Sequence, residues 1–305
     1  MQSPPTEASP PELVDTHAHL DDAAFDPDRP QVIERARQAG VNTIVLIGYR
    51  QAIWDRTIGI ARSFDGGLIA LGVHPGNADE FDDGTIDRLR VAITDSGAVA
   101  IGETGIDLLR DGPPLGLQER VFRAQLDLAV ELGLPTIIHQ RAAELEALAV
   151  LRETPIDQTI VMHSFDASER TAAVGRERGW YVGVGGLMTR VASEGIRHII
   201  HDYPLDRLLL ETDAPYLVPT GVRMRRNEPA NVAVIAARLA RLRGLSVAEV
   251  ARATTANARR VFGARRPAGG ETASDTGSND LRPTPDRDGQ RRPPGGTDSD
   301  FTAIP

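Results

Sequence analysis

Residues 99–139 read VAIGETGIDLLRDGPPLGLQERVFRAQLDLAVELGLPTIIH, and they carry the signals of a strand, a helix and a second strand in succession. The apolar runs at 99–103 and 136–139 have the length of buried strands. Between them, apolar side chains recur at helical spacing, and Gly133 ends the helix predicted over 117–132. This order is typical of a parallel sheet.

The same alternation continues on both sides of this stretch. Strands are predicted at residues 13–17, 43–48, 68–73, 99–103, 136–139, 159–163, 181–184 and 208–212. Helices are predicted at residues 30–39, 52–64, 86–94, 117–132, 142–152, 168–178, 194–201, 230–242 and 247–262. The strands are continuous apolar runs, as in sheets covered on both faces, and no G-x-G-x-x-G motif follows the first. Eight strand–helix units therefore predict an α/β fold, a single (β/α)8 TIM barrel.

The length of 305 residues accommodates one such barrel, which typically takes about 250. We expect a flexible lead-in at 1–11, the barrel over 12–264, and a disordered tail over 265–305, where little apolar surface is available for burial. No apolar run approaches the roughly 18 residues of a membrane span, and the first residues lack the features of a secretory signal. The sequence thus predicts a cytoplasmic protein without a membrane partner and identifies no protein partner.

The ionisable residues exclude several kinds of chemistry. The chain has no cysteine and all 34 basic residues are arginine, which removes disulfides, thiolate ligands, Schiff bases and carboxylated lysine. The net charge of −9 does not favour nucleic-acid binding by the surface as a whole. A metal centre with a local group of arginines could still attract an anionic substrate.

Five of the seven histidines fall at or just after the C-terminal end of a predicted strand. In a barrel these ends share one face, where active sites are built. His17 and His19, two residues apart on a strand, would point the same way and could bind one ion. A mixed set of six ligands predicts a pair of divalent cations: His17, His19, Glu103, His139, His163 and Asp213. Since the chain has no lysine that could be carboxylated to bridge the ions, a carboxylate side chain has to form the bridge, and Glu103 is the candidate.

Arginines near the same strand ends are candidates for binding an anionic substrate, namely Arg141, Arg223, Arg225 and Arg226. The alternatives are a solvated run of charge after the eighth strand and, for Arg141, an ion pair with Glu144. His198 and His201 fall inside a predicted helix, and we interpret them as surface or packing residues.

Eight stretches in a fixed order carry a family resemblance: VDTHAHLDDAAFD, LIALGVHP, AIGETGIDLLR, QERVFRAQLDLAVELGLPTIIHQR, VMHSF, LLLETDAPYL, RRNEPANV and TTANARRVFG, within residues 14–263. In these the chain resembles the TatD family of metal-dependent deoxyribonucleases, among the amidohydrolase-like barrels. The resemblance implies one ion on His17, His19, Glu103 and Asp213, and a second on Glu103, His139 and His163. Zn²⁺, Mg²⁺ and Mn²⁺ all suit such ligands. The resemblance also implies that His74 contacts substrate or phosphate, and the alternative is a structural hydrogen bond at the rim of the barrel.

Three positions depart from the family pattern. Gly76 stands where a second histidine often follows GVHP, and Ser164 stands where a cysteine commonly follows the histidine. The loop TGVRMRRNEP lacks the lysine often seen before NEP. None of these is a predicted ligand, so the departures concern substrate preference more than reaction type.

The function predicted from the sequence is metal-dependent hydrolysis of DNA phosphodiester bonds, which the resemblance suggests is exonucleolytic. In this hypothesis Asp213 orients the attacking water and takes its proton, while Glu103 bridges the ions. A D-aminoacyl-tRNA deacylase, or another ester or amide hydrolase on the same two-metal site, is the alternative. A non-enzymatic binding platform would be expected to lack at least one of the six ligands.

Overall fold

The computed structural model describes residues 11–166 and 168–263. The predicted tail at 265–305 and residues 1–10 of the predicted lead-in lie outside the described residues. No helix within the described ranges combines the length and apolar character needed to cross a membrane.

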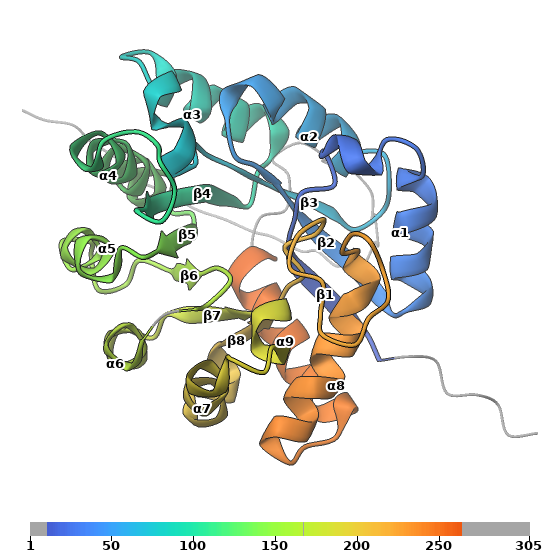
Figure 1. Ribbon diagram of the computed structural model, residues 1–305. Coiled ribbons are helices and arrows are strands. Elements are labelled where there is room, and N and C mark those ends of the chain that lie inside the picture. The colour runs from blue at the N-terminus through green and yellow to red at the C-terminus, as the bar shows by residue number, and fades with distance from the viewer. Residues whose placement is uncertain (1–10, 167, 264–305) are drawn as a thin grey trace, which may run out of the picture. The chain divides into compact units, whose positions relative to one another are not determined.

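Eight parallel strands form one sheet in which each strand pairs with its neighbours in sequence. They are β1 (Leu13–Ala18), β2 (Val41–Gly48), β3 (Gly67–Leu71), β4 (Ala100–Asp107), β5 (Thr136–Arg141), β6 (Ile160–Met162), β7 (Tyr181–Val184) and β8 (Leu208–Leu210). A parallel bridge between Ala18 and Ala214 joins the end of β1 to the chain beyond β8. The sheet is thereby nearly closed, and the predicted (β/α)8 barrel is confirmed (Figure 1).

Helices surround the sheet, with a helix between each pair of consecutive strands (Figure 1). They are α1 (Arg29–Gln38), α2 (Trp54–Ala61), α3 (Thr85–Ser96), α4 (Leu115–Leu132), α5 (Glu144–Leu151), α6 (Glu169–Arg178), α7 (Glu194–Asp202), α8 (Val232–Arg243) and α9 (Val247–Phe262). Helix α4 ends at Gly133, whose φ of 61° is the left-handed conformation that glycine adopts without a steric penalty. The start of α9 is fixed by a capping box between Ser246 and Glu249.

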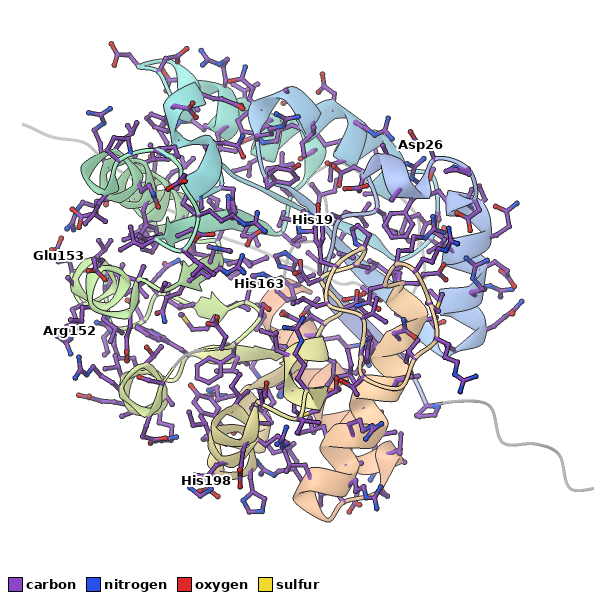
Figure 2. The ribbon with its side chains drawn as sticks, viewed as in Figure 1. His19, Asp26, Arg152, Glu153, His163 and His198 are labelled. Atoms are coloured by element: carbon purple, nitrogen blue, oxygen red, sulfur yellow. The ribbon has the colours of Figure 1, made fainter. Side chains whose placement is uncertain are left out.

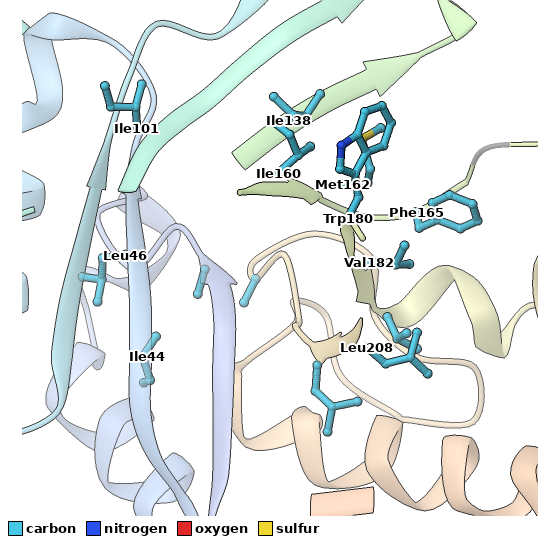
Figure 3. Close-up of a cluster of buried hydrophobic side chains, with 14 of the residues drawn as sticks. Ile44, Leu46, Ile101, Ile138, Ile160, Met162, Phe165, Trp180, Val182 and Leu208 are labelled. Carbon is cyan, nitrogen blue, oxygen red and sulfur yellow. The ribbon is translucent and has the colours of Figure 1, made fainter. Parts of the chain in front are cut away.

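The strands are apolar throughout because both of their faces are buried. On β2, Ile44 and Leu46 belong to the cluster packed against the helices, whereas Val45 and Ile47 belong to the cluster inside the barrel. Figure 3 shows part of the first cluster, including Ile44 and Leu46. This alternation is the two-residue period of a strand with two apolar environments.

Helix α9 covers the N-terminal ends of the strands. The side chain of Asn257 donates to the carbonyl oxygen of Leu208 at 2.8 Å, at the start of β8. The Thr255 hydroxyl donates to the carbonyl of Glu12 at 2.9 Å, just before β1. Phe262 joins the cluster inside the barrel. With this end closed by packing, the C-terminal ends of the strands are left for polar side chains.

The predicted end of the fourth strand at Glu103 was wrong, since β4 runs on to Asp107. Its pairing with β5 shifts register between Ile101 and Thr104, where Gly102 has a φ of 147°. A Cβ at Gly105 would lie 1.9 Å from the carbonyl oxygen of His139, so only glycine fits there. The prediction failed because buried polar residues and glycines interrupt the apolar run although the strand continues through them.

Candidate metal centre

The six predicted ligands come together at the C-terminal ends of the strands, and we call them the ligand cluster: His17, His19, Glu103, His139, His163 and Asp213. His17 lies on β1, Glu103 on β4 and His139 on β5. His19 and His163 directly follow β1 and β6, and Asp213 lies three residues after β8. Figure 2 shows His19 and His163 near the centre of the barrel and His198 at its outer surface. The convergence that the barrel fold predicted is therefore present.

Glu103 lies between two groups of histidines. Its Oε1 is 2.7 Å from Nδ1 of His139 and 3.4 Å from Nε2 of His163. Its Oε2 is 3.6 Å from Nε2 of His17 and 3.9 Å from Nε2 of His19. We call the first group the His139 half (His139 and His163) and the second the His19 half (His17, His19 and Asp213). Each oxygen of this one carboxylate faces a different half.

The His19 half is completed by Asp213. Its Oδ1 lies 3.3 Å from Nε2 of His19 and 3.7 Å from Nε2 of His17, and these two nitrogens are 3.3 Å apart. Metal–ligand bonds of about 2.0–2.2 Å place two ligand atoms of one ion roughly 3–3.6 Å apart. The spacing of these imidazole and carboxylate atoms therefore fits a divalent cation.

The charges of the cluster oppose the effect of burial. Burial alone would raise the pKa of Glu103, but the surrounding histidines, His163 first, hold it well below its usual range. Burial would lower the pKa of His139, yet hydrogen bonds to Asp107 and Glu103 raise it to about 9. Such a site binds positive charge firmly, and a divalent cation would take the place of the histidine protons.

Three buried carboxylates beside the cluster were not among the predicted site residues. Oδ2 of Asp107 is 3.2 Å from Nε2 of His139, and Oε1 of Glu211 is 3.1 Å from Nδ1 of His163. Asp15 instead accepts from the backbone nitrogen of Thr212 at 2.9 Å. Each lies two or four residues from a predicted ligand along the chain, so the two-residue period that linked His17 to His19 could have identified them.

His74 also reaches the cluster, with Nε2 3.9 Å from Oε1 of Glu103. The backbone nitrogen of Gly76 donates to Nδ1 of His74 at 2.9 Å. The lone pair on Nδ1 is thus engaged, so a neutral ring carries its proton on Nε2. Burial lowers the pKa of His74 to about 4, which keeps the ring neutral at pH 7. This arrangement favours a hydrogen-bond donor, although His74 also lies with Asp107 and His139 in a group of side chains that could hold an ion.

The predicted substrate arginines differ in their surroundings. Arg226 forms ion pairs with Asp28 and Glu228, and its guanidinium lies 4.6 Å from the ring centre of Phe25, so it ties its loop to the segment before α1. Exposed Arg223 and Arg225 and half-buried Arg141, by contrast, form no side-chain hydrogen bond or ion pair in the described part of the chain. These three guanidinium groups remain available to an anion.

The two histidines interpreted as surface residues lie on α7, away from the cluster. His198 and His201 are exposed, and both lie near the carboxylate of Asp202, at 3.8 and 2.7 Å. The position of these side chains agrees with the interpretation made from the sequence.

Comparison with known proteins identifies the family. The family model "TatD related DNase" matches residues 14–263. The uncharacterized metal-dependent hydrolase YabD of Bacillus subtilis is 35% identical, over 82% of this chain and 98% of its own length. The 3'-5' ssDNA/RNA exonuclease TatD of Cronobacter sakazakii is 36% identical, over 82% of this chain and 97% of its own. The crystal structure of YjjV, a TatD homologue from Escherichia coli, has a TM-score of 0.77 at 32% identity, covering 83% of this chain and 98% of that one. The chain belongs to the TatD family and is a metal-dependent hydrolase.

Proposed function

We propose that this hydrolase is a deoxyribonuclease that shortens single-stranded DNA from its 3′ end with the aid of two divalent cations. The observation that carries the proposal is the position of Glu103, whose two oxygens face different halves of the ligand cluster. The substrate class is supported by a relative of 36% identity that is named as a 3'-5' ssDNA/RNA exonuclease.

The six side chains would divide between two ions. Oε2 of Glu103 and the side chains of the His19 half would bind one ion. Oε1 of Glu103 and the side chains of the His139 half would bind the other. Divalent ions in such a site supply a water of lowered pKa and positive charge against the phosphate oxygens. Glu103 then acts as the residue that couples the two halves.

Asp213 would take the proton of the attacking water. Burial alone would raise the pKa of Asp213, but the hydrogen bond with His19 and the charges of nearby histidines lower it. The carboxylate is therefore ionised at neutral pH and can accept a proton. The side chain of Asp213 is 14% exposed, whereas that of Glu103, the other carboxylate of the cluster, is 5% exposed and that of His17 is 0% exposed. Asp213 therefore lies nearer to solvent than Glu103. An incoming substrate and water can reach it.

Neutral and cationic donors around the cluster would hold the phosphate. The Nε2–H of His74 would donate to a non-bridging phosphate oxygen, because its ring is fixed through Nδ1 by Gly76. Arg141, Arg223 and Arg225, whose side chains form no hydrogen bond or ion pair with the described residues, would add positive charge. This local group offsets the overall charge of −9.

The test uses metal-stripped protein with Mn²⁺ restored and two substrates in parallel. A single-stranded oligonucleotide labelled at its 5′ end should shorten progressively from the 3′ end, and a phosphorothioate at the 3′-terminal linkage should slow the reaction. D-aminoacyl-tRNA should stay intact. Deacylation of the tRNA with no change in the oligonucleotide would overturn the proposal in favour of an ester hydrolase.

A further inference from the structure

The two halves of the ligand cluster differ in what lies behind their imidazole rings. His139 turns Nδ1 to Glu103, and its other nitrogen forms a hydrogen bond of 3.2 Å with Asp107. His163 turns Nε2 to Glu103, and its other nitrogen lies 3.1 Å from Glu211, within ion-pair distance although outside hydrogen-bond geometry. In the His139 half, each ring therefore has a second carboxylate behind it.

The His19 half has no such support. The outward nitrogens of His17 and His19, Nδ1 in both rings, are buried and have no hydrogen-bond partner among the residues that the structure describes. Two buried carboxylates lie two residues from these histidines in sequence. Asp15 binds backbone nitrogens instead of a ring, and Oδ1 of Asp21 has no hydrogen-bond partner in the described part of the chain. The two halves therefore differ in the residues around the ligands as well as in the ligands, since Asp213 belongs to the His19 half alone.

Two other residues fix the position of Glu211. Its side chain is 1% exposed, and its Oε1 accepts a hydrogen bond from the backbone nitrogen of Ser164. Ser164 has a φ of 44°, a left-handed conformation that non-glycine residues seldom adopt, and it directly follows His163. On the other side, a Cβ at Gly183 would lie 2.1 Å from Oε2 of Glu211. Gly183 leaves the space, and Ser164 ties the carboxylate to the chain at His163.

Asp107 is held just as firmly. Its Oδ1 accepts from the backbone nitrogen of Leu109 at 2.9 Å, which leaves Oδ2 directed at His139. The backbone nitrogen of Asp107 donates to the side chain of Gln118 on α4 at 2.9 Å. The carboxylate is thus positioned by its own loop and by a helix, independently of the ring that it faces.

We propose that Asp107 and Glu211 are positioning residues that make the ion of Glu103, His139 and His163 the more tightly bound of the two. This inference rests on the two-ion site of the proposed function. A carboxylate on the far nitrogen of a ligating imidazole fixes its tautomer and ring orientation and increases its basicity. The His139 half has this arrangement twice, whereas the His19 half lacks it.

The experiment is a calorimetric titration of Mn²⁺ into the metal-stripped full chain. The wild type should show two classes of site, with His139→Gln removing the tighter class and His19→Gln the weaker. Glu211→Gln keeps an oxygen for Ser164 and loses only the charge, and Asp107→Asn does the same toward Leu109. Each should weaken the tighter class by roughly 10–100-fold and leave the weaker class unchanged.

Asp15→Asn is the matched control, because it removes a buried carboxylate that faces backbone nitrogens, and it should spare the tighter class. Circular dichroism checks folding, and if Glu211→Gln fails to fold, Asp107→Asn alone decides. Equal affinities in the wild type, unchanged affinities in both variants, or weakening confined to the His19 half would each overturn the inference. Two unequal sites without any DNA hydrolysis would leave it standing and overturn the proposed function instead.

Discussion

Oε1 of Glu103 lies 2.7 Å from Nδ1 of His139, and this contact joins β4 to β5 within the ligand cluster. The opposite oxygen of the same carboxylate faces the His19 half. If Glu103 bridges two ions, Glu103→Gln should lower the affinity for both, because an amide offers one neutral oxygen in place of two charged ones. Elemental analysis after dialysis measures this. Loss of a single ion from the variant would contradict the bridging role.

Asp213→Asn should separate proton transfer from metal binding. The variant keeps size and one oxygen but cannot take a proton from water, so kcat should fall by about 10²–10⁴-fold. The rate is measured at saturating Mn²⁺, with bound metal counted in the same sample. Near-normal kcat in a fully loaded variant would exclude Asp213 as the proton acceptor.

His74→Ala tests whether His74 donates to the substrate or binds metal. Because Nδ1 is engaged by Gly76, the variant should bind as much metal as the wild type. Loss of one hydrogen bond of about 1.4 kcal/mol should lower kcat/KM roughly tenfold. A fall in metal stoichiometry would instead show that His74 is a ligand.

Arg225→Ala should affect binding more than chemistry. The exposed guanidinium has no partner in the described part of the protein, and a charge-assisted contact to phosphate contributes roughly 1.5–3 kcal/mol. KM should rise and its dependence on salt should become shallower, while kcat changes little. Arg241→Ala, in the last turn of helix α8, serves as a control for net charge. Unchanged KM and salt slope would make the run at 223–225 a solvated charge cluster.

Arg226→Ala should act on stability. Buried Glu228 would keep Arg35 as a partner at 2.8 Å but lose the ion pair with Arg226, at a cost of about 1–2 kcal/mol, or a Tm decrease of roughly 2–8 °C. Arg223→Ala is the control and should leave Tm unchanged.

Hydrogen bonds from Arg226 and Arg35 lower the pKa of Asp28. The ionised Asp28 carboxylate therefore stabilises the folded protein above the unfolded pKa of 3.8, and this contribution is lost as pH falls through the lowered pKa of the folded state. The contribution should be smaller in Arg226→Ala.

Much of the barrel could be predicted because its strands are buried on both faces. The run from Ile44 to Ile47 is apolar at every position, since the odd and even side chains enter different clusters. The prediction failed on β4, where Gly105 and Asp107 continue the strand with residues that do not resemble one. Pairing of β4 with β5 outweighs the local composition there.

The ligand cluster could be predicted because barrel topology brings all strand ends to one face. The carboxylates behind the rings, Asp107 and Glu211, lie two or four residues from a predicted ligand, but the sequence does not show which imidazole ring each of them faces. The ion pair between Arg226 and Asp28 also could not be predicted, because the two residues are 198 positions apart in the sequence and only the tertiary structure brings them together.

The most direct test of a two-ion phosphodiesterase is the rate of oligonucleotide shortening measured as Mn²⁺ is added, one equivalent at a time, to the metal-stripped protein. Because Asp213 and Glu103 would act together only with both halves filled, the rate should stay near zero through the first equivalent and rise through the second. A full rate after one equivalent, or hydrolysis that persists in a chelator, would contradict the account.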